Sequence, residues 1–193
     1  MPERTPSQTV GPYLHIGLTP GAFGAREIFG PEVAGPGIEG SHIRIEGRVF
    51  DGEGNPLPDA LVEIWQADAQ GRYAHPADGR PRTSNSFRGF GRCATGKDGG
   101  FHFITIKPGP VPGPKGIQAP HINVGLFARG MLKRVFTRIY FSGDAGHADD
   151  AILALVPAER RDTLLAKPDP AKPGLFRFDI CLQGAAETVF FDL

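Results

Sequence analysis

Alternating hydrophobic and polar residues predict a chain that is built mainly of β-strands. Ile43, Ile45 and Val49 alternate with polar residues, which is the two-residue period of a strand with one buried face. Alternation and short apolar runs predict further strands at 61–66, 101–106, 121–128, 135–141, 176–182 and 187–192. About seven short strands in one chain are typical of an all-β protein with a β-sandwich architecture.

Turn and helix signals divide these strands. Segments 51–56 and 98–100 are rich in Gly, Asp and Asn and predict turns, the second of which leads into the strand at 101–106. One short helix is expected at 157–165, where a proline stands near the first turn and leucines stand at the end. Residues 1–40 have little periodicity, so we expect an extended N-terminal arm (1–40) followed by a sandwich domain (41–193).

The composition agrees with this prediction and excludes some classes of partner. The 193 residues include 27 Gly and 19 Pro, and the regular apolar runs between them indicate long, ordered loops rather than disorder. Lys+Arg and Asp+Glu balance at 21 each, and no basic run stands out. Nucleic acid and anionic membrane surfaces are therefore poor candidates as partners.

The cysteines and the apolar segments bear on the cellular compartment. Cys93 and Cys181 lie far apart in strand-like stretches, and we expect buried free thiols. No segment has the apolar length of a membrane span or the pattern of a signal peptide. These observations lead us to expect a cytoplasmic protein.

One short motif resembles half of a metal site. In Pro120-His121-Ile122-Asn123, His121 and Asn123 are two residues apart on a predicted strand and so point to the same face. A second histidine at that position would complete a pair of imidazole ligands, but Asn123 is a poor ligand for a transition metal. Tyr73 is the other candidate, because phenolate and imidazole together suit ferric iron.

Several longer segments resemble the intradiol catechol dioxygenases. They occur in the same order as in that family, cover nearly the whole chain, and lie at 63–73, 105–109, 119–123, 138–141 and 188–192. The resemblance implies a β-sandwich of the intradiol dioxygenase type, and an activity that cleaves an aromatic ring with O2 at a non-haem ferric iron.

The resemblance also implies that this chain has lost the iron site. Of the family's two tyrosine and two histidine ligands, the first tyrosine and the first histidine match Tyr73 and His121. The second tyrosine falls at Val111 and the second histidine at Asn123, while an arginine that assists the substrate falls at Gln118. We therefore expect no metal and no catalytic residue in this chain, and the four ligand positions are called the vestigial site below.

The family includes enzymes that are built from two homologous subunits, with Fe(III) in the β subunit, and this chain resembles their α subunit. The expected partner is thus an iron-bearing β subunit in an αβ hetero-oligomer, with a small aromatic substrate and O2. By the same resemblance, Thr9, Gly11, Pro12 and Tyr13 match the arm that lies against the partner's pocket, and Arg129 matches a substrate-binding arginine. A guanidinium offers paired donors to a benzoate carboxylate.

Other hypotheses remain open from the residues alone. The chain could be a metal-free binding module of transthyretin-like architecture that functions without a partner. It could also be a self-sufficient homomeric dioxygenase, which Val111 and Asn123 disfavour. Arg129 is as readily explained by a surface salt bridge, and Tyr73 and His121 by structural hydrogen bonds.

Overall fold

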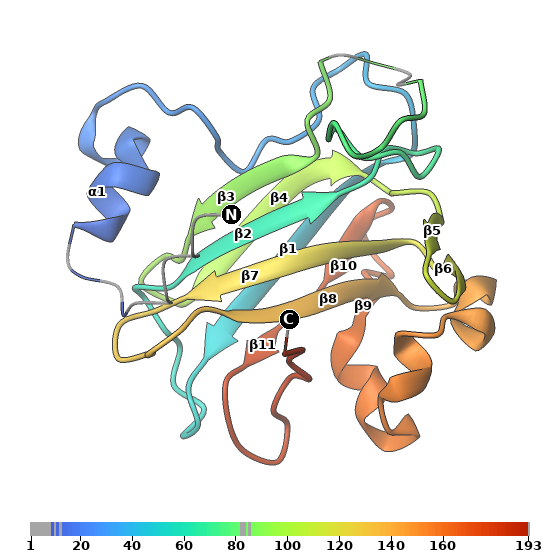
Figure 1. Ribbon diagram of the computed structural model, residues 1–193. Coiled ribbons are helices and arrows are strands. Elements are labelled where there is room, and N and C mark those ends of the chain that lie inside the picture. The colour runs from blue at the N-terminus through green and yellow to red at the C-terminus, as the bar shows by residue number, and fades with distance from the viewer. Residues whose placement is uncertain (1–8, 10, 12, 82–83, 85, 193) are drawn as a thin grey trace, which may run out of the picture.

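The computed structural model describes residues 9, 11, 13–81, 84 and 86–192, and its core is a sandwich of β-strands (Figure 1). The strands are β1 (His42–Phe50), β2 (Leu61–Gln66), β3 (Phe90–Ala94), β4 (Gly100–Ile106), β5 (Val111–Gly113), β6 (Gly116–Gln118), β7 (His121–Phe127), β8 (Val135–Phe141), β9 (Leu165–Pro168), β10 (Leu175–Arg177) and β11 (Ile180–Cys181). The helical segments are α1 (Leu14–Leu18) and the 3₁₀ helices η1 (Pro20–Phe23), η2 (Ala145–Asp149), η3 (Leu153–Leu155) and η4 (Ala158–Leu164). The predicted β-sandwich is confirmed.

The strands form two layers that are joined through β9. In one layer β1 pairs antiparallel with β4 on one side and parallel with the short strands β10 and β11 on the other. The second layer has the order β8-β7-β2-β3, with antiparallel neighbours throughout. Because β9 pairs with both β10 and β8, the sheet continues around one side of the sandwich.

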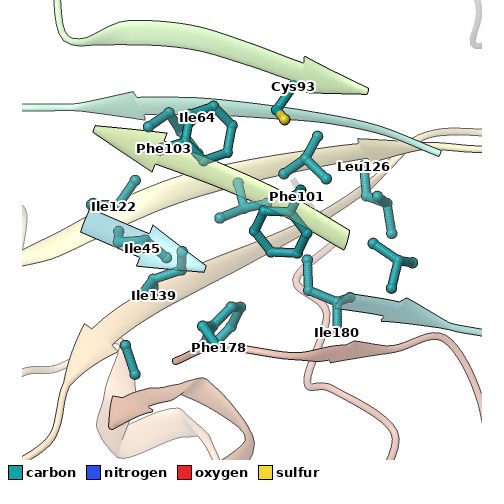
Figure 2. Close-up of a cluster of buried hydrophobic side chains, with 14 of the residues drawn as sticks. Ile45, Ile64, Cys93, Phe101, Phe103, Ile122, Leu126, Ile139, Phe178 and Ile180 are labelled. Atoms are coloured by element: carbon teal, nitrogen blue, oxygen red, sulfur yellow. The ribbon is translucent and has the colours of Figure 1, made fainter. Parts of the chain in front are cut away.

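Apolar side chains from the inner faces of both layers form the core. Ile45 and Phe103 come from the first layer and Ile64, Ile122 and Ile139 from the second, and none is more than 1% exposed. Figure 2 shows these side chains gathered between the strands. Burial of each contributes roughly 1.5–3 kcal/mol, so the choice of inner and outer face in every strand is strongly determined.

The strand predicted at 176–182 is interrupted and forms two strands, β10 and β11. Between them, Phe178 N donates a hydrogen bond to Glu46 O (3.0 Å), and the Asp179 carboxylate accepts one from Arg48 N (2.8 Å). The carbonyl oxygen of Phe178 approaches β1 so closely that a Cβ at Gly47 would lie 1.7 Å from it. The chain therefore leaves the regular ladder for two residues and rejoins it.

Other element predictions were wrong in detail. Residues 187–192 do not form a strand. The Thr188 hydroxyl accepts a hydrogen bond from Cys181 N (3.0 Å), and Thr188 N donates one to Cys181 O (2.9 Å). Phe191 makes only an isolated bridge with Phe136. The helix predicted at 157–165 is the 3₁₀ helix η4, and the other helical segments and strands β3, β5, β6 and β9 were not predicted. None of the helices in the described part of the chain has the length and apolar character of a membrane span.

Both cysteines are free thiols in strands, and their burial differs. Cys93 in β3 is buried, as predicted, whereas Cys181 in β11 is only half-buried. Strand β11 lies at the end of the sheet, so its last residue lacks cover on one side.

We predict that Gly47→Ala destabilises the protein by about 1–3 kcal/mol, because the new methyl group overlaps a backbone carbonyl that cannot rotate away. Gly125→Ala is a matched control in another strand, where the nearest side-chain atoms lie 4.0 Å from the added Cβ. Urea unfolding of the purified protein measures both changes. Equal stability of the two variants would contradict the proposed role of Gly47.

Candidate functional site

The outer face of the β8-β7-β2-β3 layer carries the residues that the sequence marked as a possible metal site. Most even-numbered residues of β2 and β7 are buried in the core, so the odd-numbered residues point outward. The strand register places Trp65 opposite Asn123, and Asn123 opposite Arg138. These three residues form a row across the outer face.

A tight loop after β2 holds Tyr73 above this row. The Asp68 carboxylate accepts hydrogen bonds from Gln70 N (3.0 Å) and Arg72 N (2.9 Å), which closes the loop. Gly71 has φ +74°, and a Cβ there would lie 1.9 Å from Pro110 O, so this turn requires glycine. The Tyr73 ring consequently lies 5.0 Å from the Trp65 ring, between centroids.

His121 and Val111 complete the vestigial site, and both side chains are buried. His121 is 2% exposed, and its Nδ1 lies 2.8 Å from Ala119 O. Burial lowers the pKa of His121 to about 4, so the ring is neutral at pH 7. Val111 is buried at the start of β5 and presents only carbon.

The guanidinium of Arg138 lies beside the vestigial site and acts on Tyr73 and His121 through its charge. Arg138 Nη1 donates to Gln118 Oε1 (2.7 Å) and to the Tyr140 hydroxyl (3.2 Å). Asn123 Nδ2 donates to the Tyr73 hydroxyl (3.3 Å), so two of the former ligand positions bond to each other. Burial raises the pKa of Tyr73, against the opposing effects of the Asn123 hydrogen bond and the Arg138 charge. A fixed positive charge therefore lies among residues that would otherwise surround a cation.

A groove of about 680 Å³ lies beside the vestigial site on the same face. Its walls are mainly aromatic and basic, and they include Phe29, Trp65, Phe90, Phe136, Arg88 and Arg134. Glu63 lies on this face with 12% of its side chain exposed and pairs with Arg92 (2.5 Å) and Arg134 (4.0 Å). The acidic group is thus already neutralised within the chain.

Arg129 lies at the opposite end of the same layer. It follows the last residues of β7 and stands six residues beyond Asn123, which corresponds to about 20 Å along a strand. Its Nε forms an ion pair with the Asp59 carboxylate, and 71% of its side chain is exposed. Arg129 therefore makes the salt bridge that the sequence allowed, and it cannot reach the vestigial site of its own chain.

The N-terminal segment exposes a set of large apolar side chains. Four of them leave between 46% and 79% of their surface exposed, namely Tyr13 (79%), Ile16 (46%), Phe23 (58%) and Ile28 (76%). Thr9 and Gly11 are exposed as well, while Pro12 lies outside the described residues. In Figure 1, α1 stands off the end of the sheet at which β7 finishes, away from β5 and β6.

The structure thus groups the predicted site residues in two places. Tyr73, His121 and Asn123 meet at one end of the layer, and Arg129 lies at the other. Sequence reasoning missed Arg138 and Asp59. Arg138 had a detectable signal, because it is the one charged residue in the strand predicted at 135–141, beside 121–128. Pairing Asp59 with Arg129 requires the strand register.

Comparisons with known proteins show which family this chain resembles in sequence. Residues 32–184 match the family model described as dioxygenase. The chain is 46% identical to the protocatechuate 3,4-dioxygenase alpha chain of Burkholderia cepacia, covering 99% of this chain and 98% of the relative. It is 38% identical to the beta chain of the same name and organism, over 77% of this chain and 67% of the relative.

A solved structure supports the same assignment. The dioxygenase domain of a dioxygenase carbohydrate-binding protein fusion from Streptomyces sp. SirexAA-E superimposes with a TM-score of 0.63 and 30% identity, covering 95% of this chain and 100% of that one. The chain belongs to the intradiol dioxygenase family. The predicted family membership is confirmed.

The residues of this dioxygenase chain do not fit the iron on which the family depends. Val111 has no donor atom, the amide of Asn123 is engaged with Tyr73 and Trp65 O, and Arg138 brings a positive charge to the same place. Among the described residues, no group of three or more His, Cys, Asp or Glu side chains could hold a metal ion. A resident iron would lack suitable ligands at two of the four family positions and would lie near the positive charge of Arg138, which acts on both Tyr73 and His121.

We predict that restoring the ligands is insufficient while Arg138 remains. The variant Val111→Tyr/Asn123→His should bind Fe(III) roughly 10-fold or more weakly than the same variant with Arg138→Gln, because the cation opposes a second cation nearby. Both variants share the packing cost of the new tyrosine. Metal analysis after dialysis measures the iron bound per chain, and equal iron in both would contradict the blocking role of Arg138.

A second prediction concerns pH. The pKa of His121 is lowered from near 6.5 to about 4, so between these values the unfolded chain binds a proton that the folded chain does not. The stability that depends on neutral His121 is therefore complete above about pH 6.5 and decreases as the pH falls toward 4, by at most about 1.4 kcal/mol per pH unit. His121→Asn should make urea unfolding less pH-dependent in this range. An unchanged slope would contradict the assignment.

Proposed function

We propose that this chain is the α subunit of a protocatechuate 3,4-dioxygenase and acts in a hetero-oligomer with a homologous β chain. Its full-length similarity to an α chain of that name supports the subunit assignment, and its weaker similarity to a β chain supports a partner of the same fold. Fe(III) would be held by the β chain, where it would supply the chemistry that a catechol needs to react with O2. This chain supplies no iron ligand.

The observation that carries the proposal is the separation of the two groups of residues. Of the family's metal positions in this chain, one is a valine and another is Asn123, which donates a hydrogen bond to Tyr73, while the charge of Arg138 acts on Tyr73 and His121. The exposed cation Arg129 lies about 20 Å away along the layer, at an end where this chain has no vestigial ligands. Such an arginine serves a pocket that another chain completes.

The reaction proposed for the complex adds both atoms of O2 to the ring. Cleavage of 3,4-dihydroxybenzoate between its two hydroxylated carbons gives 3-carboxy-cis,cis-muconate, with no other oxidant or reductant. The substrate carries a carboxylate at neutral pH, remote from the carbons that react. Arg129 binds that carboxylate and thereby selects and orients a carboxylated catechol.

The N-terminal arm is the second proposed contribution of this chain. Residues 30–34 are anchored on the chain's own sandwich, since Arg92 N donates to Gly30 O (3.1 Å) and Val33 N to Ile104 O (2.8 Å). The exposed apolar side chains of the arm all lie before this anchor. We propose that the segment containing Thr9, Gly11, Pro12 and Tyr13 covers the partner's pocket and excludes water from it.

A metal-free binding module remains the alternative function. The groove of about 680 Å³ beside Trp65 is the feature that would serve it. That hypothesis predicts a function that does not depend on a second chain, and it gives no role to the pairing of α and β relatives.

We predict that Arg129→Ala in the assembled αβ complex raises KM for protocatechuate and leaves the iron content unchanged. Loss of a charge-assisted contact corresponds to roughly 1.5–3 kcal/mol in kcat/KM. Steady-state kinetics and metal analysis of the same preparation provide the two measurements.

Arg48→Ala is the matched control, because Arg48 is another exposed arginine in an ion pair (3.6 Å to Asp98) but lies on the first layer. It should leave KM unchanged. If Arg129→Ala also leaves KM unchanged, Arg129 does not bind the substrate.

A further inference from the structure

Asp59 and Arg129 meet because of the register between β2 and β7. The last residues paired in these strands are Leu61 and Phe127. Asp59 precedes Leu61 by two residues and Arg129 follows Phe127 by two, so the antiparallel register brings both to the same end of the layer. The carboxylate of Asp59 binds Arg129 Nε there.

The backbone on both sides of this ion pair is held in place. Buried Thr95 accepts a hydrogen bond from Ala60 N (2.9 Å) and donates to Leu57 O (2.7 Å), which fixes the turn that carries Asp59. On the other side, a turn follows β7, in which Met131 N donates to Ala128 O (3.3 Å). Asp59 is also the more buried partner, with 22% of its side chain exposed against 71% for Arg129. The carboxylate is thus the anchor, and the guanidinium is the group that it orients.

The ion pair leaves the two terminal nitrogens of the Arg129 guanidinium available to bind a ligand. Asp59 contacts Nε, on the side of the planar group. Within the described part of the chain, the two terminal nitrogens of Arg129 donate no hydrogen bond, and the side chain is largely exposed. An arginine held at Nε presents its two terminal nitrogens as a pair of parallel donors, which is the arrangement that a carboxylate accepts.

We propose that Asp59 is the positioning residue for Arg129, and that it aims the free edge of the guanidinium at the substrate's carboxylate. This inference rests on the proposed function, since it takes Arg129 as the group that binds the carboxylate. A role for Asp59 as a competitor of the substrate predicts the opposite effect of its removal on substrate binding. If Asp59 competed with the substrate for Arg129, removal of Asp59 would tighten substrate binding. If Asp59 positions Arg129, its removal weakens substrate binding.

The test is Asp59→Asn in the assembled complex with the β chain, since asparagine keeps the shape and removes the charge. KM for protocatechuate should rise roughly two- to fivefold, the range expected for an exposed ion pair, with kcat within about twofold and iron unchanged. KM for a catechol probe without a carboxylate should not change, and Asp59→Glu should restore part of the binding of protocatechuate. In an Arg129→Ala background, Asp59→Asn should have no further effect on KM.

Asp98→Asn is the matched control, since it removes the carboxylate of another exposed arginine pair, Arg48–Asp98, and should leave KM unchanged. An unchanged or lower KM for protocatechuate in Asp59→Asn, with a raised KM in Arg129→Ala, would overturn the positioning role and leave the proposed function intact. An unchanged KM in Arg129→Ala would overturn both the substrate contact and the positioning role. An equal loss with the carboxylate-free probe would show a purely structural effect and would also overturn the positioning role.

Discussion

The antiparallel pairing of β7 with β2 and β8 determines where the candidate functional side chains lie. Burial of Ile64, Ile122 and Ile139 fixes which face of these strands points to the core, and a shift of one residue would turn every outer side chain inward. With the register fixed, Asn123 lies between Trp65 and Arg138 at one end of the layer. The same pairing brings Asp59 to Arg129 at the other end.

The polar side chains of the vestigial site have hydrogen-bond partners within this chain. A buried imidazole and a half-buried phenol without partners would cost free energy, and the structure gives each of them a hydrogen bond. Arg138 supplies positive charge at the place where the family uses a cation, and Gln118 and Tyr140 satisfy one of its terminal nitrogens. Fold and polar satisfaction are therefore retained, while Val111 and Asn123 replace two of the family's four iron ligands.

Much of this arrangement could be predicted from the sequence, and the exceptions have physical reasons. The strands at 61–66 and 135–141 follow from alternation or apolar runs with clear ends, and both bounds agree with the structure. The interruption at Phe178 could not be predicted, because it arises from a carbonyl that approaches Gly47 on a strand more than 100 residues away in the chain. The departures from the family's ligands were visible at Val111 and Asn123, but the hydrogen bonds from Asn123 to Tyr73 and from Arg138 to Gln118 depend on segments that meet only in space. Likewise, nothing near Asp59 in the sequence indicates its partner, 70 residues away.

In the proposed complex, this chain shapes a pocket and a homologous chain holds the iron. The most direct measurement compares this chain purified alone with its complex with the β chain, by iron content and by consumption of O2 with protocatechuate. We expect no bound iron and no turnover for the chain alone, and about one iron per αβ pair with turnover for the complex. Stoichiometric iron and turnover in the chain alone would contradict this expectation.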